Sequence, residues 1–461
     1  MSILAGFMVP HPPMIIPDVG KGEEKQINKT IVAYEKVAEE IISLEPEVII
    51  ISSPHAIMYA DYFHISPGKN AKGSFGRFNA SNVSFFEEYD TELRDRICDL
   101  AKADDFPAGI LGERDPELDH GTLVPLYFIR KRYKQAKIIR IGLSGLDLCD
   151  HYRMGMYIKK AVEQLNRKAV FIGSGDLSHK LQSYGPYGFA KEGPEYDERI
   201  MDVCSRAAFG ELFDFSEDFL EKAAECGHRS FVMMAGAFDG IDIKAEKLSH
   251  EDITGVGYGI CTFYPIKEDE NRFFLKQYEE KRIKEIEKKN QSSDKYVKLA
   301  RKAIEYYVTD HRHLKVTDDI DKELLSRRAG AFVSIHKHDR LRGCIGTIEA
   351  AKDNLASEII ENAISACSRD PRFDPVTIDE LKFLDINVDV LGETKNIDSK
   401  EDLDVKKYGV IVTCGNRRGL LLPDLDGVDT VDQQIEIALK KAGIKPYENY
   451  SLSRFEVVRH Y

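Results

Sequence analysis

The 461-residue sequence lacks several features that would assign it at once to a common class of protein. It has no apolar run that approaches the roughly 18–20 residues of a membrane span. No basic segment precedes the apolar stretch at its N-terminus, as a secretory signal would require. Its eight cysteines include no CxxC pair, which argues against both a disulfide framework and a thiolate zinc site. We therefore expect a cytoplasmic protein with reduced thiols.

The chain also has fewer basic than acidic residues. The chain has 65 Lys and Arg against 78 Asp and Glu, a formal net charge of -13. This balance argues against a nucleic-acid backbone or an anionic membrane surface as the main partner. What remains is a composition ordinary for a globular protein, with 43% hydrophobic and 31% charged residues. The length predicts two or three domains.

A segment dense in charge divides the chain. Residues 266–292 include the stretch from Tyr278 to Asn290, which has almost no apolar face and indicates a solvated helix or tether. Beyond it, apolar residues recur at helical spacing again. We therefore place a first domain at 1–265, a charged linker at 266–292 and a second domain at 293–461.

The first domain alternates strand and helix patterns. Short, continuously apolar strands such as EVIIIS are typical of a sheet that helices cover on both faces, which predicts an α/β fold. The second domain mixes helices with strand-like runs, which predicts an α+β domain with a mainly antiparallel sheet. In the first domain the expected strands are residues 3–9, 48–52, 138–143 and 170–173, then a pair at 241–248 and 257–263, and a helix is expected at 23–44.

Histidines follow the predicted strands of the first domain. His11 follows the first strand, His55 the second and His179 the fourth, while His120 precedes another apolar run. Each taken singly would be an ordinary loop residue. Because ligands gather beyond the carboxyl ends of strands in such sheets, four histidines in this pattern favour one common site. Imidazole is the commonest metal ligand and the usual acid or base near neutral pH.

A third ligand is expected just before a helix, where Glu225 and Cys226 stand side by side. Two histidines and a carboxylate leave coordination positions open, which suits non-haem Fe(II) and oxygen chemistry. A thiolate from Cys226 would instead favour zinc or copper. A third interpretation is that both residues only shape the turn.

Four motifs together identify a resemblance. Over nearly all of 1–265 the chain resembles the class III extradiol ring-cleavage dioxygenases of the LigB subunit type and their Memo-like relatives. The motifs are Pro10-His11-Pro12-Pro13, Ser53-Pro54-His55, Asp119-His120-Gly121 and Gly175-Asp176-Leu177-Ser178-His179.

The resemblance implies a role for each of these histidines. His11 and His55 would be iron ligands, with Glu225 as the carboxylate ligand. His179 would be the acid/base residue, and His120 would line the pocket of a catechol-like or phenolic substrate. In Memo-like proteins a cysteine takes the place of the carboxylate, and the chain shares their Cys226-Gly227 feature. We prefer Glu225 as the third ligand and keep Cys226 as the alternative.

The second domain has its own resemblance. Leu341 to Gly346 (LRGCIG) and Ser368 to Phe373 (SRDPRF) resemble the AMMECR family across 293–461. The fusion resembles the AmmeMemoRadiSam set, which implies a radical-SAM protein as partner.

Within this domain Cys344 is the candidate nucleophilic or redox residue, beside glycines that permit close approach of a ligand. We expect Arg342 to lower the pKa of its thiol, Asp370 and Arg372 to complete a polar cluster, and His336 to act as base. The alternative is a small buried thiol at a structural turn.

Three functions follow from these patterns. The first is an Fe(II)-dependent oxidoreductase that acts on a small aromatic substrate. The second is a zinc-dependent hydrolase or lyase on the same scaffold. The third is a non-catalytic metal-binding or docking component of a radical-SAM-linked modification system.

Overall fold

The computed structural model describes residues 3–114, 117–425 and 427–461. The chain forms two compact units, unit one at residues 1–279 and unit two at 280–461. The boundary falls within helix α9 (Phe274–Ser292), so the charged segment is helical over most of its length. Within the described ranges, every helix is too short or too polar to span a lipid bilayer.

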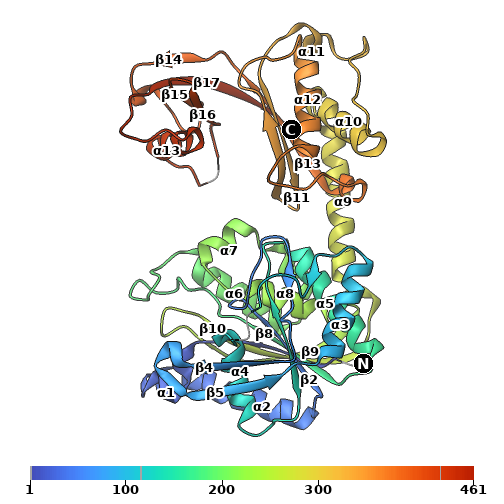
Figure 1. Cartoon of the computed structure of the whole chain (residues 1–461), viewed down its shortest axis with the longest axis vertical. Coiled ribbons are helices and arrows are strands. Elements are labelled where there is room, and N and C mark those ends of the chain that lie inside the picture. The colour runs from blue at the N-terminus through green and yellow to red at the C-terminus, as the bar shows by residue number, and fades with distance from the viewer. Residues whose placement is uncertain (1–2, 115–116, 426) are drawn as a thin grey trace. The chain divides into compact units, whose positions relative to one another are not determined.

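A six-stranded sheet forms the centre of unit one (Figure 1). Its first four strands run parallel, and the last two add an antiparallel edge. The predicted strands all appear in it, and every residue of β2 and β8 is buried, as a sheet covered on both faces requires. In spatial order the strands are β7 (Lys137–Gly142), β2 (Val48–Ser53), β8 (Ala169–Ser174), β1 (Ile3–Val9), β10 (Tyr258–Glu268) and β9 (Ile241–Glu251).

Helices cover both faces of this sheet, which confirms the predicted α/β fold. Alternate strand residues point to opposite faces, so Met8 and Ile50 join one core while Phe7 and Ile49 join the other. The first core packs against α3 (Thr91–Ala103), α5 (Leu148–Gln164), α6 (Glu192–Ser205) and α8 (His228–Gly236). The second packs against α2 (Asn28–Leu44) and α4 (His120–Arg130).

Smaller elements of unit one surround this core. The helix expected at 23–44 begins as a 3-10 segment and becomes α2 only at Asn28. Two short sheets were not predicted, because their strands are brief or half-exposed. The remaining elements are α1 (Pro17–Gly20), β3 (Phe63–His64), β4 (Asn70–Phe75), β5 (Ala80–Glu88), β6 (Ala108–Gly109) and α7 (Glu217–Ala223).

Unit two is built on an antiparallel sheet, which confirms the predicted α+β fold (Figure 1). Its strand order is β12 (Arg340–Gly346), β11 (Ala331–Lys337), β13 (Leu384–Leu391), β17 (Ser451–His460), β15 (Tyr408–Cys414) and β16 (Arg417–Leu421), with β14 (Lys395–Ile397) paired to β17. One face of β11 and β13 packs on α10 (Lys295–Asp310) and α12 (Leu355–Ser368). The other helices are α11 (Lys322–Ser326) and α13 (Val431–Ala442), the latter packed on β15 and β16.

Candidate metal centre

Two histidines from separate strand ends meet at the carboxyl edge of the unit-one sheet. His11 lies two residues beyond β1, and His55 lies two residues beyond β2. Their Nε2 atoms are 2.9 Å apart, and the rings stand at 81° to one another. The two nitrogens therefore face the same small volume, as the strand-end placement of the histidines predicts.

The tautomer of His11 follows from its hydrogen bonds. Its Nδ1 lies 3.0 Å from Ser174 Oγ, and that hydroxyl donates its own proton to the carbonyl of Gly121 at 2.6 Å. Ser174 can therefore only accept from His11, which places the ring proton on Nδ1 and leaves the lone pair on Nε2. Burial, reinforced by His55, lowers the pKa of His11 well below its ordinary value. A neutral ring fixed in this way is what a metal ligand requires.

The third ligand group comes from the turn before α8. Cys226 Sγ lies 3.6 Å from His11 Nε2 and accepts a hydrogen bond of 3.3 Å from the backbone N–H of Asp176. Ligand atoms of His11, His55 and Cys226 all lie within 4.8 Å of one another.

Glu225 is directed elsewhere. Its carboxylate accepts from the backbone N–H of His228 at 2.5 Å, at the first turn of α8, and burial raises its pKa to about 7. Consecutive residues of this turn point in different directions, and an anion at a helix N-terminus satisfies backbone donors there. The structure thus brings Cys226, the alternative, to the histidine pair rather than the preferred Glu225.

Two glycines allow the cysteine to come this close. A Cβ atom on Gly175 would lie 2.0 Å from the Cα of Gly227, so the loop after β8 and the turn before α8 touch backbone to backbone. Only residues without side chains permit that approach. The contact holds Cys226 against the end of β8, beside His11.

His120 is the third imidazole at this edge. It begins α4, and its ring centroid lies 3.9 Å from that of His55. Asp119 caps the helix by accepting from Thr122 N–H at 3.1 Å, and it also accepts from Ser53 Oγ at 2.5 Å. Burial and then the charge of His55 lower the pKa of His120 to about 3, so the ring is neutral at pH 7.

His179 completes the cluster from the loop after β8. It is half-buried, and burial lowers its pKa although Asp176 opposes that shift. The ring of Tyr187 stacks on it at a centroid distance of 5.0 Å and an angle of 26°. His179 is thus a neutral base with one face covered by an aromatic ring.

Sequence reasoning missed four residues that shape this site. Ser174 fixes the His11 tautomer, Asp119 positions α4, and the Asp176 carboxylate accepts from the backbone N–H of His11 at 2.7 Å. Each lies in or beside a recognised histidine motif, so attention to the motif neighbours could have found them. Tyr187 lies in a loop and had no signal of its own.

In unit two Cys344 lies within a polar cluster. Its Sγ accepts from Ser334 Oγ at 3.2 Å, and its backbone N–H donates to Asp370 at 2.9 Å. The Arg372 guanidinium donates to Asp370 at 2.7 Å and to the Cys344 carbonyl at 3.1 Å. Asp370 and Arg372 thus surround Cys344, yet burial still raises the pKa of its thiol.

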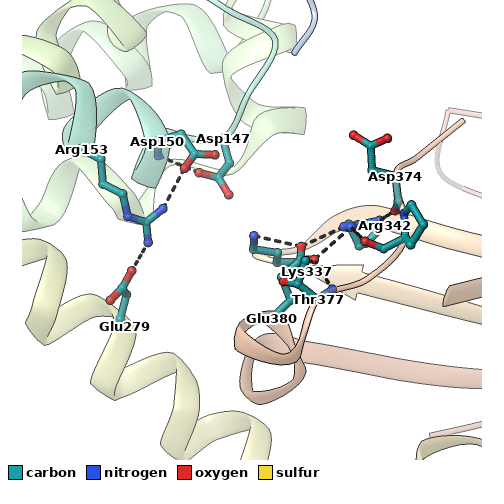
Figure 2. A network of polar contacts seen from close by, with 10 residues as sticks. Asp147, Asp150, Arg153, Glu279, Lys337, Arg342, Asp374, Thr377 and Glu380 are labelled. Carbon is teal, nitrogen blue, oxygen red and sulfur yellow. Dashed lines mark hydrogen bonds and ion pairs between the residues drawn. The ribbon is translucent and has the colours of Figure 1, made fainter. Parts of the chain in front are cut away.

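Arg342 does not act on this thiol as expected. Figure 2 shows its guanidinium directed to Glu380, with contacts of 2.9 and 3.0 Å, and to the carbonyl of Asp374 at 2.8 Å. Lys337 joins the same carboxylate at 3.2 Å. Arg342 therefore ties β12 to the segment before β13. The residue opposite Cys344 in the sheet is Ser334 and not His336, the expected base. His336 is opposite Leu341 on β12 and Asp385 on β13.

The same figure shows ion pairs within unit one (Figure 2). Arg153 on α5 donates to Asp150 at 2.7 Å and also to Glu279, at the end of the unit. These contacts attach the first turns of α9 to α5.

Comparison with known proteins assigns the first unit. The family model described as the catalytic LigB subunit of aromatic ring-opening dioxygenase matches residues 5–261, more than half of the chain. The chain belongs to the LigB family. In this LigB protein a second family model, AMMECR1, matches residues 297–460.

The chain is also similar to individual proteins. A protein of Clostridium acetobutylicum is 43% identical over 468 residues, which cover 100% of this chain and 99% of the relative. A Thermotoga maritima protein is 50% identical over 167 residues, or 36% of this chain and 96% of the relative. The 2-aminophenol 1,6-dioxygenase beta subunit of a Pseudomonas species is 24% identical over 302 residues, or 58% of this LigB protein and 95% of the relative.

Proposed function

We propose that unit one is an Fe(II)-dependent oxidoreductase that acts on a catechol-like or phenolic substrate. The observation that carries this proposal is the convergence of His11, His55 and Cys226, with the neutral rings of His120 and His179 beside them. Membership of the LigB family and the name of the Pseudomonas relative support the same chemistry. Because a fold alone does not determine an activity, the proposal depends on the site.

The residues present fit a transition-metal ion. His11 presents an Nε2 lone pair, fixed by Ser174, toward His55 Nε2 and Cys226 Sγ. Burial and the carboxylate of Asp176 raise the pKa of Cys226 well above its ordinary value, so the thiol keeps its proton until a cation replaces it. Two imidazoles and a thiolate make a donor set that first-row metals accept.

When bound, the metal would supply Lewis acidity and a template that gathers the substrate oxygens and O2. His179 is neutral at pH 7 and can accept a phenolic proton at its free ring nitrogen, then return it to the product. His120 is neutral as well, and one of its ring nitrogens can donate a hydrogen bond to a substrate oxygen. Tyr187 stacks on His179 and restricts how that ring turns.

One observation favours a second candidate. The third ligand group is the thiol of Cys226, and thiolate favours zinc or copper over the harder Fe(II). On that basis the alternative is a zinc-dependent hydrolase, or a metal-binding component that works with a radical-SAM partner without its own catalysis.

Metal analysis separates these candidates. We would purify the full chain without oxygen, quantify its metals, reconstitute it with Fe(II) and titrate with 4-nitrocatechol. One equivalent of iron and a shift of the catechol absorption band are the expected results. Stoichiometric zinc that Fe(II) does not displace would support the hydrolase. A protein that holds no metal after reconstitution would contradict the metal site itself.

Three variants sharpen the test. Cys226→Ala should lose the metal, while its neighbour Glu225→Gln should retain it; the reverse result would restore Glu225 as the ligand. His179→Gln should keep iron and catechol binding but lose O2-dependent turnover, because only the proton acceptor is removed. Unchanged turnover in His179→Gln would favour the non-catalytic component.

A further inference from the structure

The loop that leads into His179 is held from two sides. On one side Leu177 N–H donates to the carbonyl of Gly257 at 2.8 Å, and Gly257 N–H donates to the carbonyl of Ser178 at 2.8 Å. On the other side Ser178 N–H donates to the Oδ1 atom of Asp197 at 2.9 Å. Asp197 belongs to α6, so the loop is tied to a helix as well as to the residue before β10.

A histidine holds this carboxylate in place. His250 on β9 lies with its Nε2 2.8 Å from Oδ2 of Asp197, whose side chain is only 3% exposed. An ionised carboxylate only accepts hydrogen bonds, so the imidazole carries a proton on Nε2 and donates it. The two oxygens of Asp197 therefore have one donor each, Ser178 N–H and the His250 ring. Loss of the ring would leave Oδ2 buried without this donor and the carboxylate free to rotate.

The carboxylate fits closely between helix, strand and loop. A Cβ atom on Gly257 would lie 2.0 Å from Asp197 Oδ2 and 2.9 Å from the Cβ of Leu177. Only a residue without a side chain permits this approach. Because the space is so small, a displacement of the carboxylate would also displace the backbone of the loop.

The pair of side chains also borders open space. Asp197 and His250 both line a cavity of about 420 Å³, whose other lining residues come mainly from α6 and β9. A small molecule in this cavity could therefore reach the position of the His250 ring. The buried carboxylate thus connects the cavity to the loop that carries His179.

We infer that Asp197 and His250 are positioning residues for His179. The imidazole orients the buried carboxylate, the carboxylate holds Ser178 N–H, and the held backbone determines where the next side chain points. The use of His179 as a proton acceptor rests on the function proposed for unit one, whereas its positioning by this pair does not. The first test therefore uses metal-free protein and requires no turnover.

Two measurements on the full chain follow the loop directly. Mass spectrometry would record amide hydrogen exchange over residues 175–181 and the acylation of His179 by diethyl pyrocarbonate, with the exposed His311 as internal reference. His250→Ala should raise both rates, and the exchange should increase at least about tenfold, the effect of a lost hydrogen bond to a charged group. His250→Gln should remain close to the wild type, because its amide can still donate to Asp197.

The cavity allows the missing ring to be supplied from solution. Imidazole added to His250→Ala should enter the cavity, donate to Asp197 and return the exchange rate toward the wild-type value. Imidazole should have no effect on Asp197→Ala, which lacks the acceptor. Asp202→Asn is the matched control, because Asp202 lies on the same helix and lines the same cavity but pairs with Arg206. Its exchange and acylation should equal those of the wild type.

Turnover provides a separate readout. In chain reconstituted with Fe(II), His250→Ala should retain its iron and KM but lose up to about 100-fold in kcat, the cost of a reacting group displaced by about 1 Å. His250→Gln should recover most of that loss. A wild type without turnover would contradict the function proposed for unit one, and the exchange and acylation rates would still decide this inference.

Three results would overturn it. The first is unchanged exchange and acylation in His250→Ala, and the second is an equal increase in His250→Gln. The third is full kcat in His250→Ala beside an active wild type. Each of these measurements uses His250 variants, so the outcome is decided even if Asp197→Ala fails to fold.

Discussion

Ser174 controls the protonation of His11 without facing the cluster itself. Its hydroxyl accepts from His11 Nδ1 and donates to the carbonyl of Gly121. Replacing Ser174 by Ala frees the ring to carry its proton on Nε2, where the metal would bind. We expect Ser174→Ala to lower metal affinity about 10- to 100-fold, the usual effect of a lost ligand partner, as measured by competition with a chelator.

A matched serine serves as the control for this prediction. Ser52 is equally buried on neighbouring β2, but its hydroxyl contacts Ser230 at 2.5 Å and not a cluster histidine. Ser52→Ala should therefore leave metal affinity within about twofold, the scatter expected of a distant site. A similar loss of affinity in both variants would show that Ser174 acts through general packing.

Metal affinity should also rise with pH, because the ligands must lose their protons. Burial raises the pKa of Cys226 above its ordinary value, so the free thiol is protonated near neutral pH. Burial lowers the pKa of both His11 and His55, so these rings are already neutral there. One proton is thus released, and the logarithm of affinity should increase by about one per pH unit from pH 6.5 to 8. Titration calorimetry in buffers of different ionisation enthalpy measures how many protons are released when the metal binds. Release of no proton would exclude the thiol as a ligand.

The histidines of the candidate site could be predicted from the sequence, but the side chain that lies third beside them could not. A histidine after an apolar strand has its position fixed by that strand, and parallel strands end at one edge. Glu225 and Cys226 are adjacent in a turn, where a small backbone rotation decides which side chain turns inward. The deciding contact is the approach of Gly175 to Gly227, between residues distant in sequence. No local pattern contains that information.

The loop after β8 is sensitive to an added methyl group at one position but not at its neighbour two residues earlier. A Cβ on Gly175 would meet the backbone of Gly227 at 2.0 Å, whereas one on Gly173 would meet its nearest neighbour at 3.4 Å, an ordinary contact. We expect Gly175→Ala to lower the free energy of unfolding by about 1–3 kcal/mol and to abolish metal binding. Gly173→Ala should retain metal binding. Urea unfolding and metal quantification test both variants. A Gly175→Ala protein that still binds a full equivalent of metal would show that the site does not depend on contact between the loop after β8 and the turn before α8.

The Arg342–Glu380 contact makes unit two sensitive to acid. Burial opposes ionisation of Glu380, but hydrogen bonds from Arg342 and the charge of Lys337 outweigh it and lower the pKa of Glu380 to about 2. Because the pKa of Glu380 is lower in the folded state than in the unfolded state, its ionised form stabilises the fold above about pH 4.5. This stabilisation is lost as the pH falls toward about 2. Its contribution is on the order of 3 kcal/mol.

Replacing Glu380 by Gln tests this contribution. The variant should be less stable than the wild type at pH 7, and the difference should shrink as the pH falls below 4.5. Glu393→Gln, at an exposed position with no described ion pair, should show no such dependence. Chemical denaturation of unit two across this pH range measures the effect, and a constant difference between wild type and Glu380→Gln would contradict it.

Helices and strands can be predicted from the sequence where their apolar residues follow a regular pattern. The apolar strands β1 and β2 of unit one stand close to their expected bounds. The β4–β5 hairpin was missed because its residues are half-exposed and follow no clear alternation. The start of α2 was misplaced because its first turn is a 3-10 segment with the same composition.

For the whole molecule, the two units should respond separately to metal. Each has its own hydrophobic core, and the three candidate ligands all belong to unit one. Metal at 100 times its dissociation constant should stabilise that unit by about 2.7 kcal/mol and leave the other unchanged. Calorimetry with and without Fe(II) should show two transitions, of which one moves. A single transition that shifts as a whole would show that the units unfold together.

The position of β8 between β1 and β2 limits how this site can vary. Neighbouring strands lie about 4.8 Å apart. His11 follows β1 and His55 follows β2, so the strands that carry them are roughly twice that distance apart, and the two rings meet beyond the end of β8. The chain at that end is Ser174-Gly175, two of the smallest residues available. A bulky residue there would push the loop away from Gly227 and fill the gap that the imidazoles share. A variant with such a residue should therefore lose the common volume in which a metal ion would bind.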